Sequence, residues 1–167
     1  IDGVGLAPVP ARWLRTPAGL PGLRGRYFAD GELGGTATLE RIDAAIDFNW
    51  AIALAAPGLP ADGFAVRWDA ALVPDADLVG DIGFATSDAV RVWLADRLVI
   101  DRWDGQHGGP ASATAPVRLR QGEAQSVRIE WRKCGGGSVV MLGHAARADG
   151  IQAAVERTFT SLMGLFL

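Results

Sequence analysis

The sequence has little cysteine, little lysine and no long apolar run. Cys134 is the single cysteine among 167 residues, which excludes an intrachain disulfide and a cysteine-rich zinc site. All basic residues except Lys133 are arginines, whose planar guanidinium groups pair bidentately with carboxylates. The net charge of -3 gives no electrostatic basis for binding nucleic acid. The apolar runs are too short for a transmembrane helix, so we expect no membrane partner.

The chain also lacks the short motifs of common enzymes. It has no Gly-x-Ser-x-Gly elbow, no His-Glu-x-x-His and no phosphate-binding glycine loop. A glycosidase needs two carboxylates across a cleft, and no such pair can be read from the spacing of the acidic residues. We therefore expect no catalytic residues, no metal and no cofactor. Because the chain begins at Ile1 without a methionine or a signal segment, we expect it to be part of a longer protein.

Half of the residues are apolar (49%) and only 21% are charged, so the chain can bury a core. Residues 1–22 hold four of the nine prolines, which predicts an extended connector. Apolar and polar residues then alternate in several segments of 23–144, and this period of two is typical of half-buried strands. Frequent glycine turns join these segments, so we expect an all-β, antiparallel sandwich or barrel-like domain. Residues 145–167 carry apolar side chains at helical spacing and predict an amphipathic C-terminal helix over 149–165.

Several strand motifs follow one another in a characteristic order. Gly-Leu precedes an aromatic pair at 22–28, Phe-x-Val-Arg-Trp occupies 64–68, and further motifs follow at 83–94, 98–103 and 127–131. This series resembles the PA-fourteen domain, the module named after the anthrax protective antigen. The resemblance implies a β-sandwich or barrel-like fold. It also implies an association with carbohydrate, because such modules are often attached to glycosidases, adhesins and toxins.

The two flanks resemble the segments around this module in β-glucosidases of glycoside hydrolase family three. Residues 145–167 would then be a remnant of the host α/β domain. The resemblance implies a non-catalytic module that shapes or caps the sugar site of a secreted or periplasmic host. Its partners would be a β-glucoside or oligosaccharide and the host glycosidase domains in the same chain. The alternative is a structural or interaction module of an adhesin- or toxin-like protein without sugar affinity, because fold does not dictate function.

The strongest polar cluster lies at 101–109, where a strand runs into a glycine-rich loop. Trp103 could stack on the apolar face of a sugar ring, while Asp101, Asp104 and His107 could bond its hydroxyls. The competing interpretation is that Trp103 packs in the loop and the acids cap turns.

Two further residues are candidates for contact with carbohydrate. Sugar-binding adhesins that this segment resembles hold calcium with two adjacent aspartates. This chain has Asp88 followed by Ala89, so we expect no calcium-dependent binding and read Asp88 also as a turn residue. Trp93 lies on the opposite face from its apolar neighbours in the strand and could serve a binding surface. Asp96 and Arg97 stand where a tight hairpin turn is expected, and we predict a longer or different turn because arginine resists positive φ.

Overall fold

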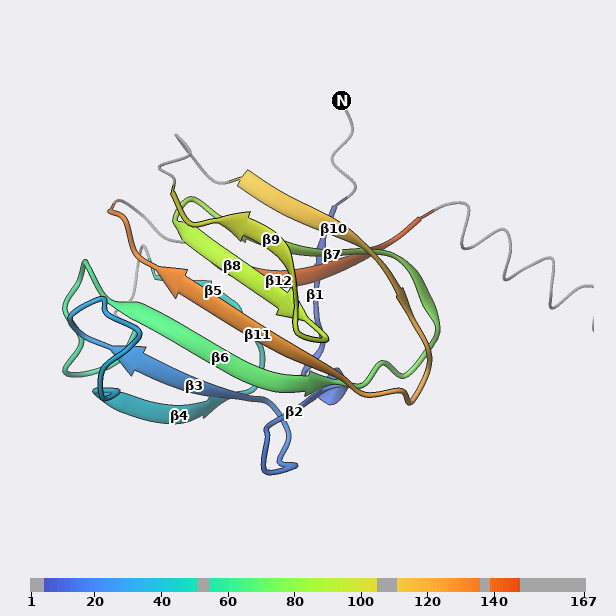
Figure 1. Cartoon of the computed structure of the whole chain (residues 1–167), viewed down its shortest axis with the longest axis horizontal. Helices are drawn as coiled ribbons and strands as arrows, with labels where there is room; N and C mark the ends of the chain where they lie inside the picture. The colour runs from blue at the N-terminus through green and yellow to red at the C-terminus, as the bar shows by residue number, and fades with distance from the viewer. Residues whose placement is uncertain (1–4, 51–54, 105–110, 136–138, 148–167) are drawn as a thin grey trace, which may run out of the picture.

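The protein folds into two antiparallel β-sheets that lie one behind the other (Figure 1). The computed structural model describes residues 5–50, 55–104, 111–135 and 139–147. The predicted all-β antiparallel sandwich is confirmed. The predicted helix over 149–165 lies outside the described residues, as does most of the C-terminal segment. Within the described residues no helix combines the length and hydropathy needed to cross a bilayer.

The larger sheet has seven strands, and its order places segments far apart in sequence side by side. β6 and β11 lie at its centre and pair along their whole length, from Gln125 opposite Leu72 to Arg132 opposite Ala65. Along β6 the side chains alternate between buried and half-buried, as expected for a sheet with one face on the core. The strands in order across the sheet are β4 (Leu39–Asp43), β3 (Leu23–Phe28), β6 (Ala65–Leu72), β11 (Gln125–Arg132), β8 (Ala89–Leu94) and β9 (Arg97–Arg102), with β2 (Leu14–Arg15) pairing to β6.

The smaller sheet has five strands and includes the start of the chain. A short 3-10 helix, η1 (Ala11–Trp13), links the first strand of this sheet to β2 of the other, and Trp13 and Leu14 are buried there. The segment predicted to be an extended connector therefore contributes to both sheets. The strands are β1 (Ala7–Pro8), β12 (Val139–Ala146), β7 (Leu78–Thr86) and β10 (Ala111–Leu119), with β5 (Asp47–Asn49) pairing to β12.

Aromatic rings fill one end of the space between the sheets. The Trp50 ring lies 6.3 Å from that of Trp68 and 5.2 Å from that of Trp131, and Phe64 lies 5.4 Å from Trp131. Trp68 and Trp131 are fully buried, which confirms their sequence-based assignment to the core. Stacked and edge-on ring pairs of this kind add stability beyond the area they bury.

The turn between β8 and β9 differs from the sequence-based expectation. Leu94 pairs with Arg97, so the connection has only two central residues, Ala95 and Asp96. Both have positive φ, 49° and 62°, as the tight hairpin turn that matches strand twist requires. The prediction of a longer turn was wrong because it placed the turn one residue too late. Aspartate tolerates the left-handed region, and Arg97 lies outside it.

Candidate functional site

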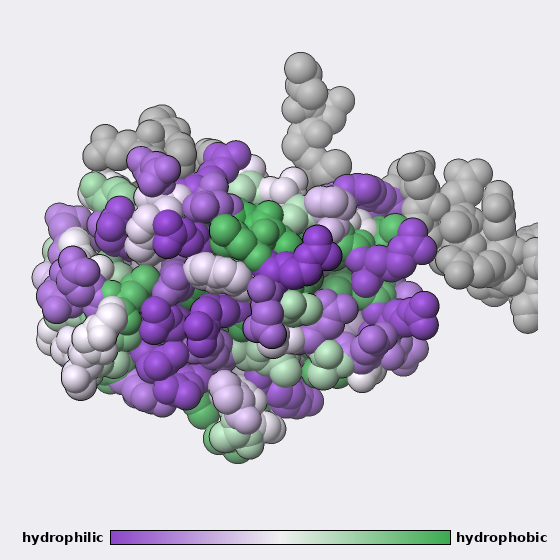
Figure 2. All heavy atoms as spheres, in the orientation of Figure 1, coloured by the Kyte–Doolittle hydropathy of each residue, from purple (hydrophilic) through white to green (hydrophobic). Residues whose placement is uncertain are grey.

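The outer face of the seven-stranded sheet carries two rows of side chains that run across its strands. Side chains on one face of a sheet recur every second residue, so the strand register decides which of them become neighbours. Figure 2 shows hydrophilic side chains gathered on this face over β3, β6 and β11. One row contains Glu40, Arg26, Arg67, Glu130, Arg91 and Asp101. The adjacent row contains Ile42, Arg24, Asp69, Arg128, Trp93 and Leu98.

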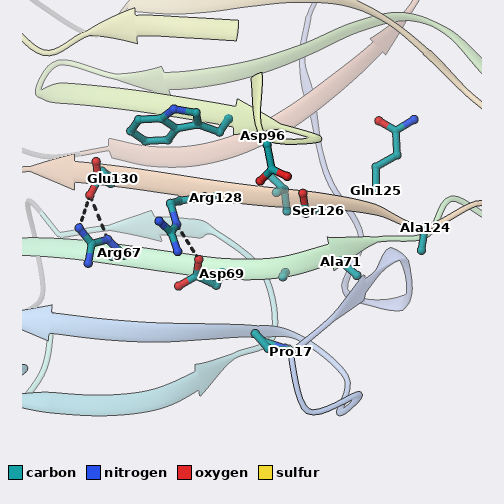
Figure 3. A pocket seen from close by; sticks show the side chains of 13 residues that line it. Pro17, Arg67, Asp69, Ala71, Asp96, Ala124, Gln125, Ser126, Arg128 and Glu130 are labelled. Carbon is teal, nitrogen blue, oxygen red and sulfur yellow. Dashed lines mark hydrogen bonds and ion pairs between the residues drawn. The ribbon is translucent and has the colours of Figure 1, made fainter. Parts of the chain in front are cut away.

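Ion pairs at the centre of the sheet join side chains within each row and between the two rows. Arg67 donates from Nε and Nη2 to Oε2 of Glu130, at 2.9 and 2.6 Å (Figure 3). Asp69 accepts from two arginines, with Arg128 Nε on Oδ1 and Arg26 Nη2 on Oδ2, both at 2.8 Å. These carboxylates are well covered, since the side chains of Asp69 and Glu130 are only 15% and 11% exposed. Charge-assisted bonds of this kind hold each side chain in one orientation.

The electrostatics of the Asp69–Arg128 pair keep both partners charged at neutral pH. Burial acts to raise the pKa of the Asp69 carboxyl, but the hydrogen bonds from Arg128 and Arg26 outweigh it, so this pKa lies below its usual range. The hydrogen bond to Asp69 raises the pKa of Arg128 above its usual value. The two groups therefore remain an ion pair throughout the physiological range.

A groove of about 640 Å³ runs over these pairs. Figure 3 shows the Arg67–Glu130 pair toward one end and Gln125 and Ala124 toward the other. Trp93, which is half-buried, and Asp96 of the β8–β9 turn also line it. The groove thus combines one aromatic ring with carboxylate, guanidinium, amide and hydroxyl groups. Such a set can stack on an apolar ring face and bond polar groups around its edge.

Trp93 is the sequence-predicted residue that lines this groove, whereas Asp101 lies in β9 of the same sheet and Trp103 directly after that strand. Asp101 Oδ1 accepts from the Trp103 backbone N–H at 3.3 Å and from Arg91 Nε at 3.4 Å. The guanidinium groups of Arg91 and Arg132 each lie 4.8 Å from the centre of the Trp103 ring. Two cations therefore already occupy positions over that ring.

The other candidates are separate from the groove. Asp88 is buried, with 1% of its surface exposed, and its Oδ1 accepts the backbone N–H of Cys134 at 2.8 Å. The interpretation of Asp88 as a structural residue therefore fits its position better than contact with a ligand. Asp104 is exposed just after β9, and His107 lies outside the described residues. Among the described residues, no three acidic, histidine or cysteine side chains gather as a metal site would require.

Sequence reasoning missed most of the groove. The alternation of Arg67 within 64–68, and of Arg128 and Glu130 within 127–132, shows that these side chains share the polar face of their strands. It does not show that β6 and β11 are neighbours, because they are about 60 residues apart in the chain. The ion pairs that line the groove could therefore not be paired from the sequence.

Comparisons with known proteins agree with the fold and find similar domains in several kinds of protein. An anti-sigma-I factor, RsgI3, from Acetivibrio thermocellus is 32% identical over 112 residues, which are 66% of this chain and 17% of that protein. A solved anti-sigma factor domain-containing protein from Clostridium clariflavum is 26% identical, with a TM-score of 0.65 over 76% of this chain and 42% of that one. The β-glucosidase from Kluyveromyces marxianus, solved with glucose, is 17% identical, with a TM-score of 0.63 over 89% of this chain and 19% of that one.

The chain spans about a sixth of the curated relative's length, so that protein's role concerns a much larger molecule. The profile of the PA14 domain matches residues 19–156, most of the sequence, and the resemblance to the PA-fourteen module is thereby confirmed. The two-layer antiparallel sandwich agrees with this match. The chain belongs to the PA14 domain family.

Proposed function

We propose that this chain is a non-catalytic carbohydrate-binding module of a larger protein, and that sugar docks in the groove beside Trp93. The observation that carries the proposal is a half-buried tryptophan next to ordered ion pairs in one groove. A pyranose presents an apolar C–H face and a rim of hydroxyls, which match an aromatic ring bordered by fixed donors and acceptors.

Trp93 is a better candidate for stacking than Trp103. A sugar on the Trp103 ring would compete with the guanidinium groups of Arg91 and Arg132, which lie over it. We therefore place Asp101, Trp103 and Asp104 outside the proposed site, since none of them lines the groove. Asp88 takes part only through the fold, because its side chain is buried.

The host of the module is a second part of the proposal. A capping role in a secreted or periplasmic β-glucosidase is supported by the fold similarity to the K. marxianus enzyme, at 17% identity. An anti-sigma factor host is supported by the higher identities of 32% and 26%. We favour the anti-sigma factor type of host. We also extend the proposed module from 23–144 to include residues 7–15, because β1 and β2 pair with the two sheets.

The second candidate function is an interaction module without sugar affinity. It is favoured by the similarity to anti-sigma factors, which are named for their action on another protein. Under this alternative the ion pairs on the sheet face would serve only folding or contact with another protein.

A glycan array probed with the full chain, followed by calorimetric titration of the glycans that bind, tests the proposal. We expect saccharide binding that persists in EDTA and that Trp93→Ala weakens by about tenfold or more, equivalent to about 1.4 kcal/mol. Trp103→Ala is the matched control and should leave the affinity within about threefold, about 0.7 kcal/mol. Binding to no glycan would reject the carbohydrate role and favour the interaction module.

A further inference from the structure

The arginines that line the groove are already committed to carboxylates. Arg67 gives two hydrogen bonds to Glu130, and Arg128 gives one to Asp69. Asp69 is also held by Arg26 from the neighbouring strand. Arg128 is half exposed and keeps further N–H groups that could reach a ligand, but the negative charges of Asp69, Glu130 and Asp96 all act on its guanidinium. An anion beside Arg128 would be repelled by these carboxylates, so the arginines of the groove form a poor anion site.

Asp96 differs from the other two carboxylates of the lining, Asp69 and Glu130, which accept hydrogen bonds from arginines. Asp96 is exposed in the β8–β9 turn, and its charge acts on Arg128, although no hydrogen bond from the described residues holds its carboxylate. A free carboxylate accepts strong hydrogen bonds from hydroxyl groups and repels anions.

Neutral polar groups complete the lining at the same end of β11. Gln125 supplies an amide, which both donates and accepts, and Ser126 supplies a hydroxyl. Trp93 lies opposite Arg128 in the strand register, in the row next to that of the Arg67–Glu130 pair. The groove therefore offers acceptors, neutral donors and an aromatic surface, and each arginine of its lining is paired with a carboxylate.

We propose that the groove selects an uncharged saccharide, with one sugar ring on Trp93 and hydroxyls that donate to Asp96. It discriminates against saccharides that carry carboxylates. This inference rests on the proposed function and adds the chemical class of the ligand. A cationic amino sugar is the competing ligand, since it could pair with the exposed carboxylate of Asp96, and the test separates the two.

Titration of the full chain with saccharides of similar length and different charge tests the proposal. The neutral probes are cellotetraose, xylotetraose and mannotetraose, the acidic probe is tetragalacturonate, and the cationic probe is the glucosamine tetramer. We expect at least one neutral probe to bind about tenfold more tightly than both charged probes. Its dissociation constant should change by less than about twofold between about 50 and about 500 mM NaCl, because salt screens only charge-charge attraction.

Variants that each remove one carboxylate charge show where on the molecule the saccharide binds. Asp96→Asn retains an acceptor and tolerates the left-handed turn, so the protein should fold as before. We expect it to weaken the affinity for the neutral saccharide by about threefold to tenfold, since an amide oxygen accepts hydrogen bonds more weakly than a carboxylate does. Asp104→Asn removes the same charge from an exposed position outside the groove and should leave the affinity unchanged. Melting temperatures of both variants show whether either has lost stability.

The possible failures are distinguishable. If tetragalacturonate or the glucosamine tetramer binds more tightly than the neutral probes and Trp93→Ala abolishes that binding, the proposed function stands and the neutral class is wrong. If Asp104→Asn weakens binding and Asp96→Asn does not, the ligand binds at the loop after β9 and the groove is the wrong site. If no probe binds, the ligand class is wrong, and a glycan array without a positive then rejects the carbohydrate function as well.

Discussion

Asp43 shows how a single buried carboxylate fixes one corner of the sandwich. Its Oδ2 accepts from the Tyr27 hydroxyl at 2.5 Å and from Trp68 Nε1 at 2.8 Å, while Oδ1 accepts from Arg41 Nε at 2.8 Å. Burial, followed by the charge of Asp43, raises the pKa of Tyr27 far above its usual value, so its hydroxyl stays protonated and donates. One carboxylate therefore accepts from three side chains of different strands, while Arg41 Nη2 also donates to the Tyr27 hydroxyl.

Replacement of Asp43 by asparagine should cost the protein much of its stability. One acceptor oxygen becomes an NH₂ group, which faces donors and cannot accept from them, and Arg41 loses its charge partner. We expect Asp43→Asn to lower the free energy of unfolding by about 3 kcal/mol in urea denaturation. Asp47→Asn, at an exposed position on β5, is the control and should change it by less than about 0.5 kcal/mol. A loss below about 1 kcal/mol for Asp43→Asn would show that the group contributes little.

The burial and the partners of single candidate residues also depend on contacts between distant segments of the chain. The alternation of side chains along the strand placed Trp93 on the outer face, and Trp93 is indeed half-buried there. The same reasoning could not show that Asp88 is buried and accepts a hydrogen bond from the backbone of Cys134, 46 residues later in the chain. Nor could it tell that Arg91 and Arg132, from two different strands, both lie over Trp103.

At the scale of elements, two glycines of β7 show different reasons for the absence of a side chain. A Cβ at Gly80 would lie 1.9 Å from the carbonyl oxygen of Ala145, which belongs to the backbone of β12. A Cβ at Gly83 would lie 2.5 Å from Cδ1 of Leu6, the end of a flexible side chain. The first contact can be relieved only by moving a strand, and the second by rotating a side chain.

The two glycine positions should therefore tolerate alanine to different extents. We expect Gly80→Ala to lower the free energy of unfolding by about 3 kcal/mol, because β7 and β12 must separate locally. Gly83→Ala should cost about 1 kcal/mol, since Leu6 can move away. Thermal and urea unfolding of both variants provide the measurement. Equal losses would mean that the contact between β7 and β12 yields as easily as a side chain.

Strand identity was easier to predict than strand ends. The segments at 90–94 and 127–132 lie in strands, and the one at 64–68 does so from Ala65 on, because alternation is a local property of the sequence. The β8–β9 turn was misplaced by one residue, because its position follows from the pairing of Leu94 with Arg97. The helix predicted over 149–165 lies outside the described residues.

At the scale of the whole molecule, the two sheets share one core. Trp131 of the larger sheet donates from Nε1 to the hydroxyl of Thr86 on the smaller sheet, at 3.0 Å. The rings of Phe48 and Trp68, which also belong to different sheets, lie 6.4 Å apart. Neither sheet can expose its inner face without the loss of these contacts, so the layers should unfold together.

Equilibrium unfolding in urea should therefore show one transition. Far-UV circular dichroism reports the strands and tryptophan fluorescence reports the rings, and we expect their midpoints to coincide. Trp131→Phe should lower the free energy of unfolding by about 2 kcal/mol without splitting the transition, since it removes a buried hydrogen bond and some packing. Fluorescence that changes at lower urea than dichroism would mean that the sheets separate before they unfold.

The sequence by itself determined the fold class, the faces of the main strands and the membership of the PA14 domain family, because each follows from residues close together in the chain. The tertiary structure alone decided which charges meet. Arg67 reaches Glu130 across 63 residues and Arg128 reaches Asp69 across 59, and both pairs exist because β6 and β11 are neighbours. The groove beside Trp93 depends on that pairing. Local alternation sets the face on which a side chain lies, whereas the choice of partner strand is a property of the whole chain.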